Sequence, residues 1–437
     1  MKMTMTGTGD SILIQGYPEE GYPGLDEVRA YIARGQARFC NLETCVTDWD
    51  TYCSAYSGGT WMNTDRRVLQ KIMDFGFNFV SFANNHTMDL GPDGLLETVE
   101  NVRATGAALA GAGKDLGEAS RPVYRDLPGG RVAFIAVSGT FNDAARAGDA
   151  TRFLKGRPGL NGLRHKKEIL VSKEHFDAIR DVAAATKINA QAEISRATGF
   201  APPLAEGAAE FGGLTLRVSP DGRECVRTTC NKKDLDRILT AVHDARYIAD
   251  YVVVMFHSHD IADGRMTQPA AYAEEFCRAV IDGGADVVFG GGTHQLKPVE
   301  IYRGKTIFYS LGNFCFQSNL VENQPADMLD KFGLGDVSGA RALAARNKEW
   351  TIGQHTQKEN FLTVIPFVSF EDGKLTSVEL MPVSLGFDKP RTFKGIPYPA
   401  KKEDADEIFS VLKSISAQYG TKLIRKDGGL IAVETEA

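Results

Sequence analysis

The stretch Ser81–Asp89 reads SFANNHTMD and joins a predicted strand to a predicted helix. Before it, Phe77–Phe82 is an apolar run of strand length, and after it Pro92–Thr105 opens with the proline that favours a first helical turn. The turn between them carries two carboxamides, an imidazole and a carboxylate. In open α/β sheets, ligands bind beyond the carboxyl ends of the strands. The stretch therefore predicts an α/β layer with a polar site at a strand end.

The sequence on both sides repeats this alternation of strand and helix. Strands are expected at Lys2–Thr8, Ala37–Leu42, Ala107–Ala110, Arg131–Val137, Tyr251–Phe256 and Ala285–Phe289. Helices are expected at Leu25–Arg34, Thr64–Phe75, Lys232–Ala245 and Ala270–Ile281. Antiparallel pairs are expected for Pro298–Tyr302 with Thr306–Tyr309, and for 361–370 with 374–383. This pattern predicts α/β layers.

The composition is that of a globular protein. The chain has 437 residues, 43% hydrophobic and 24% charged, with a formal net charge of −6. A mildly acidic chain disfavours nucleic acid and anionic membrane surfaces as partners. The longest apolar runs, such as Tyr251–Phe256, are far shorter than the roughly 18 residues of a membrane span.

The cysteines and the amino-terminal sequence predict a cytoplasmic setting. The 7 cysteines form an odd set without a paired CxxC motif, which is typical of reduced core residues. For Cys225 and Cys230, a disulfide or a metal site is the less favoured alternative. No apolar signal segment precedes Gly9-Asp10. Oligomeric state is left open.

The chain is longer than the roughly 250–300 residues at which single cores stop growing, so an insertion or a second domain is expected. Residues from about 138 to 231 are rich in Gly, Arg and Ala, and we interpret them as an insertion or cap over the α/β core. The predicted organisation is a core domain over 1–385 and a helical extension over 386–437, with one helix at Lys402–Tyr419.

Clusters of metal-ligand residue types follow the predicted strands. They are Gly9-Asp10, Asn41-Leu42-Glu43, Asn84-Asn85-His86, His257-Ser258-His259-Asp260 and Gly290-Gly291-Gly292-Thr293-His294. Each alone has a plainer interpretation, because a single Asp after a strand is usually a turn or cap residue. Of the 8 histidines, His257, His259 and His294 all fall after the later predicted strands. Carboxylate, carboxamide and imidazole together predict a site for Mn, Zn or Fe.

These clusters carry a family resemblance. The chain resembles the CapA family of poly-γ-glutamate capsule-synthesis proteins, which belong with the calcineurin-like metallophosphatases. The matching runs are Thr8–Asp10, Asn41–Glu43, Ser81–Asp89, Gly284–Gly290, Pro298–Tyr302 and Gly304–Phe314. The resemblance extends in order and spacing from residue 1 to about 320. It implies a four-layer α/β/β/α sandwich, metallophosphatase-like, with a two-metal site.

The resemblance also implies a ligand set. Asp10 would bind one metal, Glu43 would bridge both and Asn85 would bind the second. His257 and His294 would complete the shell. Two metals at such a site stabilise the attacking and the leaving oxygen and lower the pKa of bound water towards about 7.

A catalytic acid is implied next to these ligands. His86 would protonate a leaving group or donate to the charged transition state. Asp89 would orient His86, with a helix-cap role just before Pro92 as an equal alternative.

One position departs from the family pattern. Family members commonly carry a Gly-His-x-Pro-His run, and here Gly290–His294 lacks the first histidine. Our hypothesis is that His259 supplies the missing ligand, because side chains two residues apart share a face of an extended chain. The alternative is a single-metal site with His259 as a substrate contact.

The insertion contributes candidate substrate-binding residues. Gly156–Asn161 and Leu163-Arg164 resemble an Arg-Pro-Gly-x-Asn-x-Leu-Arg run in some relatives. Arg157 and Arg164 could grip an anionic group in bidentate fashion, and Asn161 and Asn313 are assigned to the same role. The alternative is a solvated basic patch. The remaining histidines are expected at the surface: His165, His175, His243 and His355.

The resemblance favours a metal-dependent hydrolase. A metal-bound hydroxide would attack an amide or γ-glutamyl-type bond of a small or polymeric anionic substrate, with one or two divalent metals per chain. The first alternative is phosphoester hydrolysis on the same site. The second is a poly-γ-glutamate binding or assembly protein without catalysis.

Overall fold

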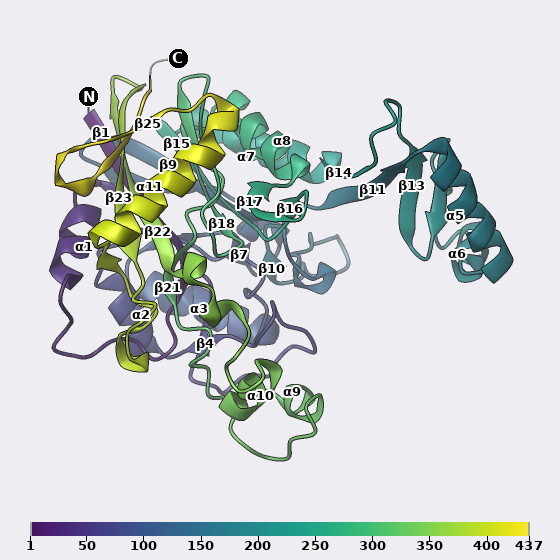
Figure 1. The fold of residues 1–437 in the computed structure, drawn as a ribbon, viewed down its shortest axis with the longest axis horizontal. Coiled ribbons are helices and arrows are strands. Elements are labelled where there is room, and N and C mark those ends of the chain that lie inside the picture. Colours follow the sequence, from purple (N-terminus) through teal and green to yellow (C-terminus); the bar gives the residue numbers. More distant parts are fainter. Residues whose placement is uncertain (1, 436–437) are drawn as a thin grey trace.

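Two β-sheets organise the fold in the computed structural model, which describes residues 2–435 (Figure 1). The larger sheet runs β25 (Leu423–Arg425), β26 (Ile431–Val433), β23 (Lys374–Ser384), β22 (Leu362–Glu371), β1 (Lys2–Ile12), β2 (Ala37–Leu42), β5 (Phe79–Ser81) and β6 (Ala108–Ala110). Off this path, β21 (Asn313–Phe316) pairs with β1 and β24 (Tyr398–Pro399) pairs with β23. Strands β1, β2, β5 and β6 are parallel, so their carboxyl ends meet at one edge.

The second sheet runs β19 (Val299–Tyr302), β20 (Lys305–Phe308), β18 (Val287–Gly292), β15 (Tyr251–Ser258), β9 (Gly130–Ser138) and β8 (Val123–Leu127). Strands β9, β15, β18 and β20 are parallel. Short pairs join β3 (Cys45–Val46) to β4 (Asn63–Thr64), β7 (Ala112–Gly113) to β10 (Gly159–Leu160) and β16 (Ile261–Ala262) to β17 (Arg265–Pro269).

Apolar side chains of the two sheets share one buried cluster. Met3 and Met5 of β1 belong to it together with Val253 of β15. The ring of Phe39 in β2 lies 5.6 Å from that of Phe289 in β18, measured between centroids. Alternate residues of each strand face this cluster, as the period of two in a β-strand requires.

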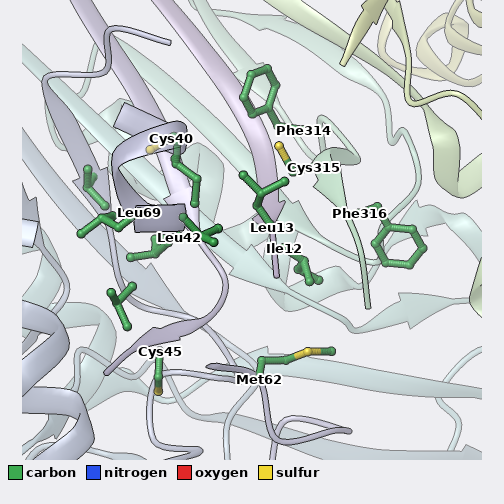
Figure 2. Close-up of a cluster of buried hydrophobic side chains, with 14 of the residues drawn as sticks. Ile12, Leu13, Cys40, Leu42, Cys45, Met62, Leu69, Phe314, Cys315 and Phe316 are labelled. Carbon is green, nitrogen blue, oxygen red and sulfur yellow. The ribbon is translucent and has the colours of Figure 1, made fainter. Parts of the chain in front are cut away.

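Helices cover the remaining faces of the sheets. A second cluster joins the larger sheet to α1 (Leu25–Ile32), α2 (Arg66–Met73) and α3 (Gly91–Ala104), and Figure 2 shows its part around Ile12, Leu42 and Phe316. A third cluster joins the second sheet to α7 (Lys232–Arg246) and α8 (Ala271–Asp282). The mixed α/β class predicted from the sequence is therefore confirmed.

Both predicted antiparallel pairs are present. β19 pairs with β20 across Arg303-Gly304, and β22 pairs with β23 across Asp372-Gly373. All four turn residues have positive φ angles, as a tight hairpin turn requires. Strand β1, predicted to end at Thr8, continues to Ile12, because β21 pairs with its last residues.

The insertion forms a small unit of its own. A sheet of β12 (Ala208–Phe211), β13 (Leu214–Val218), β11 (His165–Val171) and β14 (Cys225–Cys230) carries α5 (Lys173–Thr186) and α6 (Ala190–Ala197). Figure 1 shows β11, β13, α5 and α6 extending from one side of the molecule. Residues before 165 belong with the core instead, since Leu160 and Leu163 are buried in its clusters. The projecting part of the insertion (Figure 1) therefore begins at β11.

The segment after residue 385 contributes more than the predicted helix. Helix α11 (Lys402–Ser416) packs on β23, and β25 and β26 then extend the larger sheet from β23. The prediction of a helical extension is incomplete, because short edge strands carry little periodicity.

The shorter helices lie in connections: α4 (Leu116–Ala119), α9 (Ala326–Asp330) and α10 (Gly339–Arg346). All 7 cysteines are free thiols. Among the described residues, no helix is long and apolar enough to cross a membrane.

Candidate metal centre

Strand ends from both sheets converge on one polar cluster. The larger sheet supplies Asp10 from β1, Glu43 from just after β2, and Asn85 from the turn after β5. The second sheet supplies His257 and His259 from the end of β15 and His294 from just after β18. The structure therefore brings all six predicted metal ligands together.

Glu43 lies at the centre of this cluster. Its side chain is fully buried, and neither carboxylate oxygen has a hydrogen-bond partner among the described residues. Its Oε1 lies 3.5 Å from His257 Nε2 and 3.7 Å from His259 Nε2. Burial raises the pKa of Glu43 well above its usual value, and the carboxylates of Asp10 and Asp89 add to this rise. A buried carboxylate without donors requires a proton or a cation.

Asp10, unlike Glu43, has hydrogen-bond donors and a lowered pKa. It accepts hydrogen bonds from Asn41 Nδ2 at 2.8 Å and from the Gly292 N–H at 2.8 Å. Burial opposes ionisation, but His257 and His294 bring the pKa of Asp10 below its usual value. The bond from Gly292 also ties β1 of the larger sheet to β18 of the second sheet.

The remaining ligand atoms point at the same space. Asn85 Oδ1 lies 2.8 Å from His257 Nε2 and 3.2 Å from His259 Nε2. Asn85 Nδ2 donates to the Gly58 carbonyl at 2.9 Å, which sets the direction of its oxygen. His294 has a φ of 62°, in the left-handed region that non-glycine residues seldom adopt. Burial lowers the pKa of His294 to about 4, so its ring is neutral at pH 7.

These atoms form two groups that share Glu43. Asp10, Glu43 and His257 place one ligand atom each within 4.8 Å of one another, and so do Glu43, His259 and His294. A cation in each group would satisfy the carboxylate of Glu43 and replace its proton, because metal ligands bind deprotonated. Mixed oxygen and nitrogen donors suit Mn, Zn or Fe. The residues present therefore fit a divalent metal pair.

The missing family histidine has a local explanation. Gly291 pairs with His257 across β15 and β18, and a Cβ atom at 291 would lie 2.3 Å from Asp10 Oδ1. A larger side chain there would displace Asp10. His259 instead approaches from the end of β15, and its ring lies 5.0 Å from that of His257 and 5.2 Å from that of His294.

This geometry predicts the effect of removing His259. We expect close to two metal ions per chain in the purified wild type and close to one in His259→Ala, because the group of Glu43, His259 and His294 then loses one of its three ligand atoms. Elemental mass spectrometry measures the content. His243→Ala, on an exposed face of α7, is the control and keeps the wild-type content. One metal in both the wild type and His259→Ala would contradict the expectation.

His86 and Asp89 form a buried pair beside the cluster. His86 Nδ1 lies 2.6 Å from Asp89 Oδ2. Asp89 also accepts from the backbone N–H of Gly58 at 2.9 Å and of Met62 at 2.8 Å. Burial raises the pKa of Asp89, which His86 and these bonds oppose. The pairing leaves His86 Nε2 without a protein partner among the described residues.

The neighbouring carboxamides shape the loops. Asn84 Nδ2 donates to the Leu42 carbonyl at 2.7 Å, and its Oδ1 accepts from the His86 N–H at 3.0 Å. Asn41 links Asn84 to Asp10.

Three of the predicted substrate contacts, Arg157, Asn161 and Arg164, have hydrogen-bond partners within the protein. Arg164 forms a bidentate ion pair with Asp234, and Asn161 accepts from Arg237. Arg157 is exposed and donates to the Arg146 carbonyl at 3.0 and 3.2 Å.

Asn313, also predicted as a substrate contact, lies beside His294. Its Oδ1 lies 2.8 Å from His294 Nδ1. This contact leaves His294 Nε2 for a metal.

A cavity of about 310 Å³ opens beside the cluster. Its wall includes Asn85, His86, His259 and His294 on one side, and residues 346–347 and 353–355 on another. No motif of the sequence covers this second segment, so it was not predicted. His355, predicted at the surface, is buried there, so that prediction is wrong.

His165 is half-buried rather than exposed, and its ring stacks on Tyr272 with a centroid distance of 4.0 Å. His175 and His243 are exposed as predicted.

The fold and the cluster define an α/β protein with a candidate metal centre at the edges of two sheets. The chain belongs to the bacterial capsule synthesis protein PGA_cap family, whose model matches residues 4–318. It is 27% identical to the uncharacterised protein y4uA of Sinorhizobium fredii, over 97% of this chain and 91% of that protein. It is 24% identical to the PGA biosynthesis protein CapA of Bacillus subtilis, over 77% of this chain and 70% of that protein. A probable polyglutamine synthesis accessory protein of Mycobacterium tuberculosis is 22% identical, over 81% and 66%.

Proposed function

We propose that this chain is a metal-dependent hydrolase that cleaves an amide or γ-glutamyl-type bond of an anionic substrate. The observation that carries the proposal is Glu43, whose buried oxygens have no partner among the described residues and which two ligand groups share. A divalent metal pair held there would lower the pKa of a bound water and polarise a substrate oxygen. The four-layer sandwich is part of this proposal, supported by the apolar cluster between the sheets and the helices on their outer faces.

The chain's own residues prepare the site for acyl chemistry. His86 lines the cavity, and its Nε2, which has no protein partner among the described residues, can donate a proton to a leaving nitrogen, while Asp89 fixes the ring through Nδ1. An acyl oxyanion needs one or two donors, whereas a phosphoryl group needs a clamp on three oxygens. Among the described residues of the cavity wall, Arg346 is the one guanidinium. A wall with a single guanidinium favours the amide substrate over the phosphoester substrate.

The names of the relatives favour a second candidate function. They are called biosynthesis and synthesis accessory proteins, which suits a protein that binds or helps to assemble poly-γ-glutamate without cleaving it. The substitution of glycine at 291 is compatible with this alternative, in which the metal would be structural.

Turnover assays separate the candidates. We expect hydrolysis of γ-glutamyl amides that depends on added Mn²⁺, and no comparable hydrolysis of p-nitrophenyl phosphate. Faster release from the phosphate would establish the phosphoester alternative. Binding of poly-γ-glutamate without turnover of either substrate, at full metal content, would establish the assembly role.

A further inference from the structure

Arg346 is a cation in the cavity wall without a carboxylate partner among the described residues. It ends α10, and its side chain is half-buried. Its Nη1 donates to Thr60 Oγ1 at 2.6 Å and to the Gly59 carbonyl at 3.2 Å. No described residue accepts from its Nε or Nη2. One edge of the guanidinium is therefore anchored and the other edge is available.

Some half-buried arginines of this protein pair with carboxylates, whereas others, such as Arg38 and Arg125, donate to backbone carbonyls. Arg164 pairs with Asp234, and Arg278 pairs with Glu300 at 2.9 Å. Desolvating a charge without a partner costs free energy. Burial accordingly lowers the pKa of Arg346. An anion from outside the protein would remove this cost.

The cavity connects Arg346 to the metal-type cluster, which is the set of six predicted ligands described above: Asp10, Glu43, Asn85, His257, His259 and His294. Asn85 and Arg346 both line it, and both hold the same short loop: Asn85 Nδ2 donates to the Gly58 carbonyl, and Arg346 Nη1 donates to that of Gly59. Arg346 and residues of the cluster therefore share one cavity.

The surroundings of Arg346 are basic. After burial, the positive charges of Lys394, Arg346 and Arg391 lower the pKa of His355, which lines the same cavity. Lys394 Nζ also donates to the His355 carbonyl at 3.3 Å. Grouped positive charge at a low-dielectric wall attracts anions.

Resting on the proposed hydrolase function, we propose that Arg346 holds a free carboxylate of the substrate through Nε and Nη2 while the scissile bond lies at the metal-type cluster. A planar guanidinium edge matches the two oxygens of a carboxylate. A γ-glutamyl group meets this requirement, since a short carbon chain separates its free α-carboxylate from the γ-amide. Arg346 is then the residue that selects the acid form of the substrate.

Steady-state kinetics on a matched substrate pair test the assignment. For a γ-glutamyl anilide with a free α-carboxylate, Arg346→Gln is expected to raise KM roughly 10- to 100-fold with little change in kcat. For the α-methyl ester of the same compound, wild type and variant should have similar KM values. Equal losses on acid and ester would overturn the assignment. Arg341→Gln is the control, because it removes the same charge from an exposed residue of α10 outside the cavity wall.

Arg346→Lys is a second variant in case Arg346→Gln does not fold. It keeps the positive charge and loses the planar pair of donors of the guanidinium. Thermal melting establishes which variants are folded. Arg346→Lys is expected to have a KM for the acid between those of wild type and Arg346→Gln. A KM equal to that of wild type would overturn the bidentate contact.

Binding to chelator-treated protein separates this inference from the hydrolase proposal. Calorimetry with glutarate as the probe should show binding to wild type and Arg341→Gln, and at least roughly 10-fold weaker binding to Arg346→Gln. That result without turnover of any substrate would support the carboxylate site and refute the hydrolase. Turnover with equal glutarate binding in all three proteins would support the hydrolase and refute the carboxylate site. Tighter binding of inorganic phosphate than of glutarate would overturn the choice of a carboxylate.

Discussion

Glu43→Gln is expected to abolish metal binding by this protein. Glu43 belongs to both three-residue ligand groups, so its loss leaves two ligand atoms in each. Even the loss of an outer partner of a metal ligand costs up to roughly 100-fold in affinity, and losing a shared ligand should exceed this. We expect less than one metal per chain in the variant by elemental mass spectrometry, with turnover falling in parallel.

Stability measurements provide a second readout for Glu43→Gln. At a free metal concentration of about 100 times Kd, binding stabilises the folded wild type by about 2.7 kcal/mol, and the variant should gain nothing. In chelator-treated protein, the two should melt at similar temperatures. The raised pKa of Glu43 favours a neutral carboxyl group there, which resembles the amide of glutamine.

A matched substitution controls for the change of charge. Glu97→Gln alters a partly exposed carboxylate on α3, outside the ligand groups, and should keep the metal content and the metal-dependent rise in Tm. Retention of two metals by Glu43→Gln would remove the basis of the shared-ligand interpretation.

His86→Ala is expected to reduce kcat by roughly 10²- to 10⁴-fold, the usual contribution of a general acid or base. The metal content should stay unchanged, because His86 Nδ1 is committed to Asp89 and the residue belongs to neither ligand group. Steady-state turnover of a γ-glutamyl amide, measured with metal analysis on the same samples, checks both expectations. Added imidazole should restore part of the activity, since the truncated side chain opens into the cavity of about 310 Å³.

Two further variants are compared with His86→Ala. Asp89→Asn should lower kcat less than His86→Ala does, because the ring remains but loses the carboxylate at 2.6 Å. His243→Ala should have wild-type kcat. Unchanged turnover in His86→Ala would show that another group supplies the proton, and loss of metal in that variant would show that His86 is a ligand.

Much of the fold was predictable because its signals are local. The apolar runs of β2, β15 and β18 and the paired turns at Arg303-Gly304 and Asp372-Gly373 can be recognised within a few residues. The short strands β25 and β26 were missed, since three residues cannot display a period.

The metal-type cluster was predictable for a related reason. Parallel strands of one sheet bring their carboxyl ends to one edge, so polar residues at those ends meet wherever the layers form. The family motifs then assigned Asp10, Glu43, Asn85, His257 and His294 to that edge. His259 came from the absence of a histidine at Gly291, and the structure adds that a side chain at 291 would displace Asp10.

The α/β class, the family and the side chains that gather at the strand ends could all be inferred from the sequence. Which polar groups remain free to bind a ligand depends on the folded chain. Arg164 looked available until Asp234, 70 residues away, proved to hold it. Arg346 belongs to no motif, yet folding places it in the cavity wall next to Gly59 without a carboxylate partner among the described residues. The reason is physical: local patterns follow from backbone periodicity, whereas the charge balance of a buried side chain depends on distant residues that only the folded chain brings into contact.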